Sequence, residues 1–251
     1  MTHHLTLLTG ASRGMGLAIA QALLQPGQVL LCISRHANEA LAVQARAAGA
    51  ELTQWTMDLA DAPAVADRLE AWLREQPADR FASASLINNA GVVSAPGPLQ
   101  AASSAELSAA LRVGLEAAVL LSAAFLRATE AWPGARKVLN ISSGLGRRAM
   151  AGSAAYCAAK AGMDHLSRAL ALEQAGQAHG AKIVSLAPGV IDTDMQQQLR
   201  SADPARFPER ERFLQLKAQG LLDTPAQAAA KVLACLRRPD FGEQPVADVR
   251  D

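Results

Sequence analysis

Three side chains near the middle of the sequence have the types and the spacing needed for proton transfer. Tyr156 follows Ser143 by thirteen residues, and Lys160 lies four residues further on. If the chain is helical from Ser153 onward, the tyrosine and the lysine share one helix face. A phenol titrates near about 10 in isolation, and a nearby positive charge lowers that pKa. We expect Tyr156 to act as a general acid while Ser143 holds the reacting oxygen. The alternative is a chance Tyr-x-x-x-Lys on a helix.

A glycine-rich turn near the N-terminus has the composition of a phosphate-binding loop. The apolar run Leu5–Thr9 leads directly into GASRGMG at residues 10–16 and then into the helical pattern Leu17–Leu24. A strand, a glycine turn and a helix in this order let the backbone approach a pyrophosphate at the positive end of the helix. The alternative is a glycine turn without a ligand. The turn residues that we expect to bind a dinucleotide are Gly10, Ser12, Arg13, Gly14, Met15 and Gly16.

The end of the second apolar run, Gln28–Ser34, indicates which dinucleotide is bound. An acidic residue at this place suits NAD, whereas an arginine accommodates the 2′-phosphate of NADP. Arg35 directly follows the run, and Arg13 in the glycine turn adds a second positive charge. We therefore expect NADP(H), with two solvated arginines as the alternative. Asp58, after the third run Glu51–Met57, is expected to contact the adenine.

Apolar runs alternate with helical patterns along the whole chain. The remaining expected strands are Ala84–Asn88, Lys137–Ile141, Ala181–Ala187 and a short Gln244–Ala247, and the main expected helices are Asn38–Ala48, Asp61–Glu75, Ser104–Ala131, Ser153–Gln177 and Pro225–Leu236. Such alternation specifies a parallel sheet with helices on both faces. We predict a single α/β domain over residues 1–251, a doubly wound Rossmann-type sheet of about seven strands.

The segment 190–222 differs in composition from the rest of the chain. It is rich in glutamine and contains the charged run Arg206–Arg212. These residues are too polar to form core, so we predict a mobile helical cover over the ligand cleft.

The composition argues against several classes of partner. Lys plus Arg (24) nearly equals Asp plus Glu (23), which is not the balance of a nucleic-acid-binding surface. The longest apolar run, around Ala117–Leu126, is shorter than the roughly 20 residues of a membrane span. The three cysteines are far apart, with neither metal-ligand nor disulfide spacing. We expect a cytoplasmic protein without metal that binds neither nucleic acid nor membrane.

Taken together, these motifs resemble those of the short-chain dehydrogenase/reductase family. The residues that carry the resemblance, in the order of the family, are Thr9–Gly16, Asn88-Asn89-Ala90-Gly91, Ser143, Tyr156 with Lys160, and Pro188-Gly189. The resemblance implies that Ser143, Tyr156 and Lys160 are catalytic and that Ser143 and Tyr156 contact the substrate. It further implies that Tyr156 and Lys160 bind the cofactor, Lys160 at the nicotinamide ribose. It also implies a homodimer or homotetramer. The further cofactor contacts that it implies are Asn89, Ala90, Gly91, Pro188, Gly189 and Thr193.

Within this family the chain looks closest to sepiapterin reductases and bacterial benzil-reductase-like members. The stretch APGVIDTDMQQ at residues 187–197 and the tail from Phe241 to Asp248 carry this resemblance. It implies an NADPH-dependent carbonyl reductase that transfers a hydride to a ketone or dicarbonyl, with Met195 and Asp248 in the substrate site. Asp248 is expected to anchor the guanidine-like edge of a pterin. A solvated aspartate near the end of the chain is the alternative.

One position departs from the family pattern. The family usually has an asparagine in the long helix before the serine strand, where it holds a water of the proton relay, but Gly114 occupies that position in Val113-Gly114-Leu115. This departure keeps one alternative interpretation open, and a second stays open independently of it. The first is a cofactor-binding regulator with weakened catalysis, and the second is a generic 3-oxoacyl or sugar-type reductase.

Overall fold

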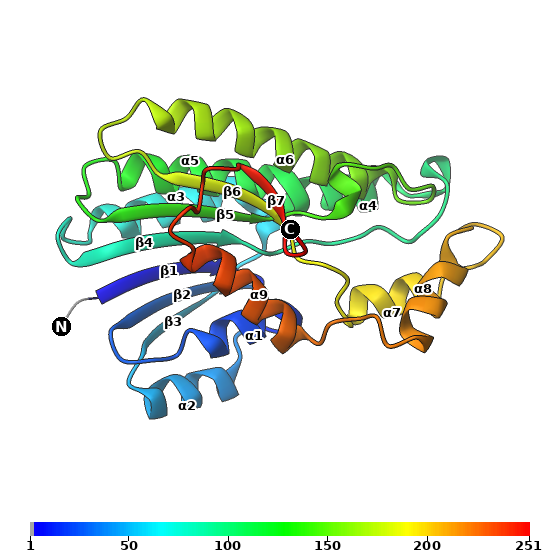
Figure 1. Ribbon diagram of the computed structural model, residues 1–251, viewed down its shortest axis with the longest axis horizontal. Coiled ribbons are helices and arrows are strands. Elements are labelled where there is room, and N and C mark those ends of the chain that lie inside the picture. The colour runs from blue at the N-terminus through cyan, green and yellow to red at the C-terminus, as the bar shows by residue number, and fades with distance from the viewer. Residues whose placement is uncertain (1–2) are drawn as a thin grey trace.

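Seven parallel strands form the centre of the molecule, in the order β3-β2-β1-β4-β5-β6-β7 (Figure 1). The computed structural model describes residues 3–251. The strands are β1 His3–Thr9, β2 Gln28–Ser34, β3 Glu51–Thr56, β4 Phe81–Asn88, β5 Ala135–Ile141, β6 Lys182–Ala187 and β7 Val246–Asp248. Every residue of β2 is buried, as expected for a parallel strand covered on both faces.

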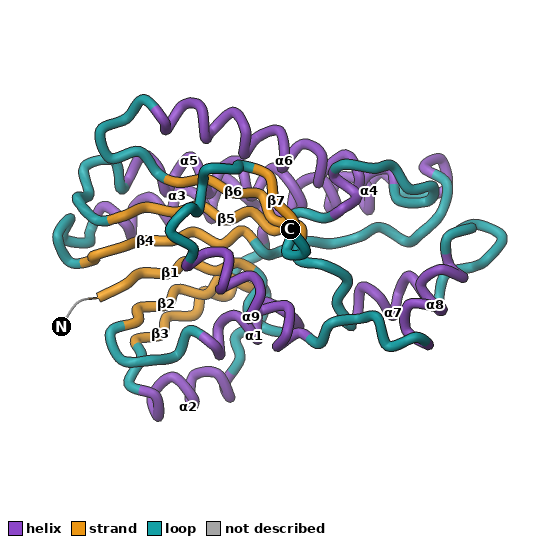
Figure 2. Tube along the Cα trace, in the orientation of Figure 1, coloured by secondary structure: helices purple, strands orange, loops and turns teal. Residues whose placement is uncertain are grey.

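Helices cover both faces of the sheet (Figure 2). They are α1 Gly14–Ala22, α2 Glu39–Ala48, α3 Ala62–Arg74, α4 Ser104–Leu111, α5 Ala117–Ala128, α6 Ala154–Ala175, α7 Asp194–Arg200, α8 Arg210–Ala218 and α9 Pro225–Arg237. Side chains of α3 and α5 build the core on one face, and those of α1, α2 and α9 build it on the other. The predicted doubly wound Rossmann-type sheet of a single domain is confirmed.

The strand order has one reversal, and it determines where a ligand can bind. Strand β1 pairs with both β2 and β4, so the chain crosses from one half of the sheet to the other between β3 and β4. In such sheets a crevice opens at the carboxyl ends of the strands where the order reverses. The glycine-rich turn after β1 and Asn89 after β4 both lie at that crevice.

The predicted helix Ser104–Ala131 is not a regular α-helix. Helix α4 passes into the π-helical segment Arg112–Glu116, and α5 then ends at Ala128. A π-helical turn inside a helix is rare and is often found at functional sites. Here it contains Gly114, the position that departs from the family pattern.

By length and composition, the whole stretch Ser104–Ala128 is apolar enough to cross a membrane, although its longest uninterrupted apolar run is short. In the fold, Ala117, Leu121 and Phe125 of this stretch are buried in the core against the sheet and α3. Core helices of folded domains pass the same length test, and the burial of α5 is that of a core helix.

The segment 190–222 forms α7 and α8, which extend beyond the carboxyl edge of the sheet (Figure 1). Contrary to the expectation from its polar composition, it has an apolar centre. Phe207 and Phe213 stack with ring centroids 5.8 Å apart, and they pack with Leu199 and Met150. These apolar residues lie on separate turns of the chain and come together only in the fold, so the sequence does not reveal the cluster.

Candidate active site

A cavity of about 710 Å³ opens at the carboxyl ends of β1, β2, β4, β5 and β6. The structure brings every residue that the sequence placed in a cofactor or substrate site to the wall of this one cavity. These are the catalytic candidates Ser143, Tyr156 and Lys160, the cofactor candidates Gly10, Ser12, Arg13, Gly14, Met15, Gly16, Arg35, Asp58, Asn89, Ala90, Gly91, Pro188, Gly189 and Thr193, and the substrate candidates Met195 and Asp248.

The glycine turn is shaped for close approach of the backbone. Gly10 and Gly14 have positive φ angles of 71° and 57°, which favour glycine. A Cβ on Gly16 would lie 2.1 Å from the Gly10 carbonyl oxygen, so no other side chain fits there without a shift of the backbone. The first turn of α1 has no side-chain cap and no acidic residue. Its free N–H groups and positive dipole end suit a phosphate group.

Asn89 joins the ends of two neighbouring strands at the floor of the cavity. Its backbone N–H donates to the Thr9 hydroxyl at 2.9 Å, and its side-chain amide donates to the Thr9 carbonyl at 2.9 Å. These contacts give Asn89 a structural role in joining the ends of β1 and β4. The cofactor contact expected of it remains a prediction.

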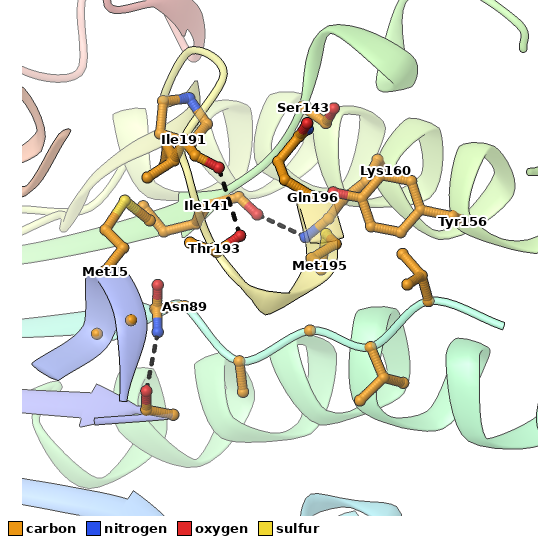
Figure 3. A pocket seen from close by; sticks show the side chains of 18 of the residues that line it. Met15, Asn89, Ile141, Ser143, Tyr156, Lys160, Ile191, Thr193, Met195 and Gln196 are labelled. Carbon is orange, nitrogen blue, oxygen red and sulfur yellow. Dashed lines mark hydrogen bonds between the residues drawn. The ribbon is translucent and has the colours of Figure 1, made fainter. Parts of the chain in front are cut away.

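Tyr156 and Lys160 lie on one face of α6 and point into the same cavity, with Ser143 beside them (Figure 3). Lys160 is 3 % exposed, and its Nζ donates a 2.7 Å hydrogen bond to the Ile141 carbonyl at the end of β5. The same Nζ lies 5.6 Å from the centroid of the Tyr156 ring. Burial lowers the pKa of Lys160 to about 8, and the Asp164 carboxylate acts in the opposite direction.

The pKa of Tyr156 does not follow the expectation from the sequence. Burial raises the pKa of this phenol, whereas a hydrogen bond with Ser143 lowers it. Desolvation of the phenolate is the largest cause of the shift, and the expected lowering by the lysine charge is not among its causes.

The two arginines proposed for cofactor selection have different surroundings. Arg13 forms an ion pair with Asp194 at the start of α7, and both side chains are 69 % exposed. This pair connects the glycine turn to the segment 190–222 across the cavity. Arg35 follows β2 and is exposed at the cavity wall. Asp58 accepts a 2.9 Å hydrogen bond from the Ala60 N–H and caps a short helical turn, and its contact with adenine stays a prediction.

Asp248 is not the solvated residue that the alternative assumed, since its side chain is 9 % exposed. Arg250 donates to both of its carboxylate oxygens, at 2.7 and 2.5 Å, and Arg147 lies 3.8 Å away. The hydrogen bond from Arg250 is the main cause that lowers the pKa of Asp248. The carboxylate lines the cavity, but its charge is already balanced by two arginines.

Apolar residues around Ser143 and Tyr156 form a part of the site that the sequence analysis does not predict. Met195 lies on the cavity wall as expected, together with Leu145, Met150, Leu199, Phe213 and Leu216. The spacing of Met195 and Leu199 on one helix face was the available signal, but the polar residues between them hid it. Gln196 of α7 is also 9 % exposed and lines the cavity.

Gly114 lies against α6. A Cβ at this position would be 3.2 Å from the Cβ of Ala159, the residue before Lys160. The absence of a side chain thus lets the π-helical segment and α6 pack closely beside Lys160. Within residues 3–251, no group of three or more His, Cys, Asp or Glu side chains is arranged to hold a metal ion.

The chain is similar in sequence and structure to known oxidoreductases. It is 33 % identical to the benzil reductase ((S)-benzoin forming) of Bacillus cereus, with 94 % of each chain covered. It is 35 % identical to the sepiapterin reductase of Rattus norvegicus, which covers 94 % of this chain and 92 % of the relative. An actinorhodin polyketide ketoreductase solved with NADPH superposes with a TM-score of 0.80 at 25 % identity, covering 99 % of this chain and 97 % of the other.

The family model for short chain dehydrogenases matches residues 4–204. Members of this family bind a nicotinamide cofactor and act on carbonyl or hydroxyl groups, which fits a crevice with a glycine turn on one side and a Ser-Tyr-Lys set on the other. The chain belongs to the short-chain dehydrogenase/reductase family.

Proposed function

We propose that this protein is an NADPH-dependent reductase of uncharged ketones and dicarbonyls, with Tyr156 as the proton donor. The observation that carries the proposal is the presence of Ser143, Tyr156 and Lys160 in the same cavity as an uncapped, glycine-lined helix N-terminus. A hydride donor and a proton donor must reach one carbonyl group from fixed positions, and this crevice has room for both.

The residues of the crevice fit a dinucleotide. The space that a Cβ on Gly16 would fill lies at the uncapped N-terminus of α1, where binding of a pyrophosphate is favoured. The nicotinamide supplies the hydride. Gly91 lies beside Lys160, since a Cβ there would be 3.8 Å from the ammonium nitrogen. Lys160 would hold the nicotinamide ribose at this place by hydrogen bonds to its hydroxyls.

The protein itself handles the proton and the oxygen of the substrate. Ser143 donates a hydrogen bond to the carbonyl oxygen and holds it near the phenol. Tyr156 then gives its proton to that oxygen as negative charge develops there. The positive charge of Lys160 stabilises the phenolate that remains. Burial, which raises the pKa of the resting phenol, keeps the proton in place until the substrate arrives.

NADPH rather than NADH is supported by charge at the adenosine end. Arg35 stands at the end of β2, where a 2′-phosphate is recognised, and no acidic residue replaces it. Arg13 adds a second positive charge once it leaves Asp194. The similar ketoreductase was solved with NADPH, which agrees with this choice.

The substrate end favours an aryl dicarbonyl of the benzil type over a pterin. Its wall includes the apolar side chains Leu145, Met150 and Phe213, which belong to one cluster. A pterin would need the Asp248 carboxylate, which Arg250 already binds at both oxygens. Binding a pterin at Asp248 would replace its bidentate pair with Arg250 by another bidentate pair, so the gain in binding free energy would be small. The similarity to benzil reductase points the same way.

The segment 190–222 and the assembly complete the proposal. We infer that α7 and α8 move as a cover when ligands enter, since within residues 3–251 the one ion pair that links them to the glycine turn, Arg13 with Asp194, is exposed.

We also infer a dimer or tetramer. Exposed apolar side chains on the helices of one face support it, with Leu172 79 % and Leu111 41 % exposed. Light scattering coupled to gel filtration tests the assembly.

The test of the function is a substrate comparison with purified protein. We expect NADPH consumption with benzil to be faster than with sepiapterin, and NADH to be a poor replacement. NADPH binding with no turnover on either compound, or on a wider panel of ketones, would support the regulator interpretation instead. Faster turnover of 3-oxoacyl thioesters than of benzil would support the generic reductase.

A further inference from the structure

A buried carboxylate lies one helical turn beyond the catalytic lysine. Asp164 of α6 is 1 % exposed. Its Oδ1 accepts a 2.6 Å hydrogen bond from the Ser185 hydroxyl on β6, and its Oδ2 accepts a 3.3 Å hydrogen bond from Arg147 Nε. A Cβ on Gly146 would lie 2.8 Å from Oδ2, so the turn after β5 closes directly over the carboxylate. Asp164 is therefore held in one position from two directions.

Arg147 is itself fixed by the last strand. It donates a 2.7 Å hydrogen bond to the Ala247 carbonyl on β7 and lies 3.8 Å from Asp248. The charges thus alternate from the catalytic helix to the end of the chain. Lys160 is positive, Asp164 negative, Arg147 positive and Asp248 negative.

Lys160 is buried against a neutral partner. Its Nζ hydrogen bond goes to the backbone carbonyl of Ile141, and burial of an ammonium group without a nearby negative charge is strongly unfavourable. Burial lowers the pKa of Lys160 to about 8, and in the described part of the chain the charged group that opposes this is Asp164. The other groups around the ammonium carry no charge. They are the Tyr156 phenol and the Met163 thioether on α6, Gly91 after β4 and the backbone of β5.

We propose that Asp164 is a positioning residue that acts through Lys160. Its fixed carboxylate keeps the neighbouring ammonium charged inside the cavity, and Arg147 limits this effect by sharing the same carboxylate. The inference rests on the proposed role of Lys160 in carbonyl reduction and adds two residues that set its charge. Removing the negative charge of Asp164 and removing the positive charge of Arg147 must then shift the protonation of Lys160 in opposite directions.

The test is a titration of Lys160 by NMR on protein labelled with carbon-13 in its lysine side chains. The chain has five lysines, and the Lys160 signal is identified by its loss in Lys160→Met. We expect Asp164→Asn to lower the midpoint by about one pH unit and Arg147→Met to raise it. Ser185→Ala removes a hydrogen bond to the same carboxylate without changing any charge, so its midpoint should stay at the wild-type value.

The pH dependence of kcat gives a second readout. Lys160 must be charged to stabilise the phenolate, so a midpoint about one pH unit lower makes the rate about tenfold lower on the alkaline side. Arg147 has a side chain 32 % exposed, so its variant tests the proposal even where Asp164→Asn does not fold.

An unchanged Lys160 midpoint in Asp164→Asn, or shifts of the same sign in both charge variants, would overturn the proposal. The NMR titration needs no turnover. A failed reductase assay therefore contradicts the proposed function alone, and the titration still decides whether Asp164 sets the charge of Lys160.

Discussion

The ammonium nitrogen of Lys160 lies 5.6 Å from the centre of the Tyr156 ring and donates its hydrogen bond to the Ile141 carbonyl instead of to the phenol. The end of β5 thus fixes the ammonium group beside the tyrosine ring. The phenol keeps Ser143, and not Lys160, as its hydrogen-bond partner. This arrangement also buries a positive charge, which lowers the stability of the folded protein.

Lys160→Met should abolish reduction and stabilise the protein. Burial lowers the pKa of Lys160 from its ordinary 10.5 to about 8, so the unfolded chain holds this proton more tightly than the folded one. The difference corresponds to about 3 kcal/mol, and loss of the Ile141 hydrogen bond offsets about 1 kcal/mol of it. We expect a gain of about 1–3 kcal/mol at pH 7.

The pH dependence of that gain has a definite sign. Below pH 8 Lys160 is charged in the folded protein, and its burial lowers the free energy of unfolding by the full amount. As the pH rises from about 8 toward 10.5, the folded protein loses this proton and recovers that stability. The advantage of the methionine variant must therefore shrink over that range. Urea unfolding at several pH values measures it. Lys182→Met is the matched control, because Lys182 is exposed on β6 and should show no gain. A methionine variant less stable than wild type at pH 7 contradicts the prediction.

Arg35→Ala should reduce the preference for NADPH over NADH. Loss of a charged hydrogen bond to a phosphate removes about 1.5–3 kcal/mol of binding, which is roughly a ten- to hundredfold change in Kd for NADPH and little change for NADH. Fluorescence titration with each cofactor measures this. Arg46→Ala serves as the control because Arg46 is also exposed, but it lies on α2 away from the cavity. Equal loss for both cofactors would show that Arg35 does not read the 2′-phosphate.

Arg250→Ala should improve activity on a pterin and leave benzil reduction unchanged. Removing the bidentate arginine frees the Asp248 oxygens for a guanidine-like edge, whereas an uncharged diketone makes no use of them. The ratio of kcat/KM values for sepiapterin and benzil measures the effect. A ratio that stays constant or falls means that Asp248 does not face the substrate.

Gly16→Ala should destabilise the fold even without cofactor. The added Cβ would lie 2.1 Å from the Gly10 carbonyl oxygen, and a backbone atom cannot move away as a flexible side chain can. Overpacking of this kind costs about 1–3 kcal/mol. Gly176→Ala is the control, since a Cβ there meets nothing within 4 Å. Thermal unfolding of both variants decides the matter, and equal melting temperatures would contradict the prediction.

Much of the fold and of the site was readable from the sequence because the signals are local. Buried parallel strands are short apolar runs, and the residues directly after them meet at one edge of the sheet. That is why the sequence alone predicts that Gly10, Asn89, Ser143 and Pro188 lie together, as they do in the cavity wall. Tyr156 and Lys160 needed only the helical repeat to share a face.

The features that the sequence did not reveal depend on tertiary packing. The π-helical turn at Gly114 arises where two helices approach beside Ala159. The apolar centre of α7 and α8 forms from residues separated by charged ones. Burial, which decides the pKa of Tyr156, cannot be read from neighbouring residues in the chain.

Replacement of the proton donor is the most direct test of the central claim. Tyr156 is the only tyrosine in the sequence, so Tyr156→Phe removes every phenol from the protein and keeps the ring. We predict that this variant binds NADPH as the wild type does, while kcat for benzil reduction falls about 100-fold or more. Near-wild-type turnover by the phenylalanine variant would contradict the claim.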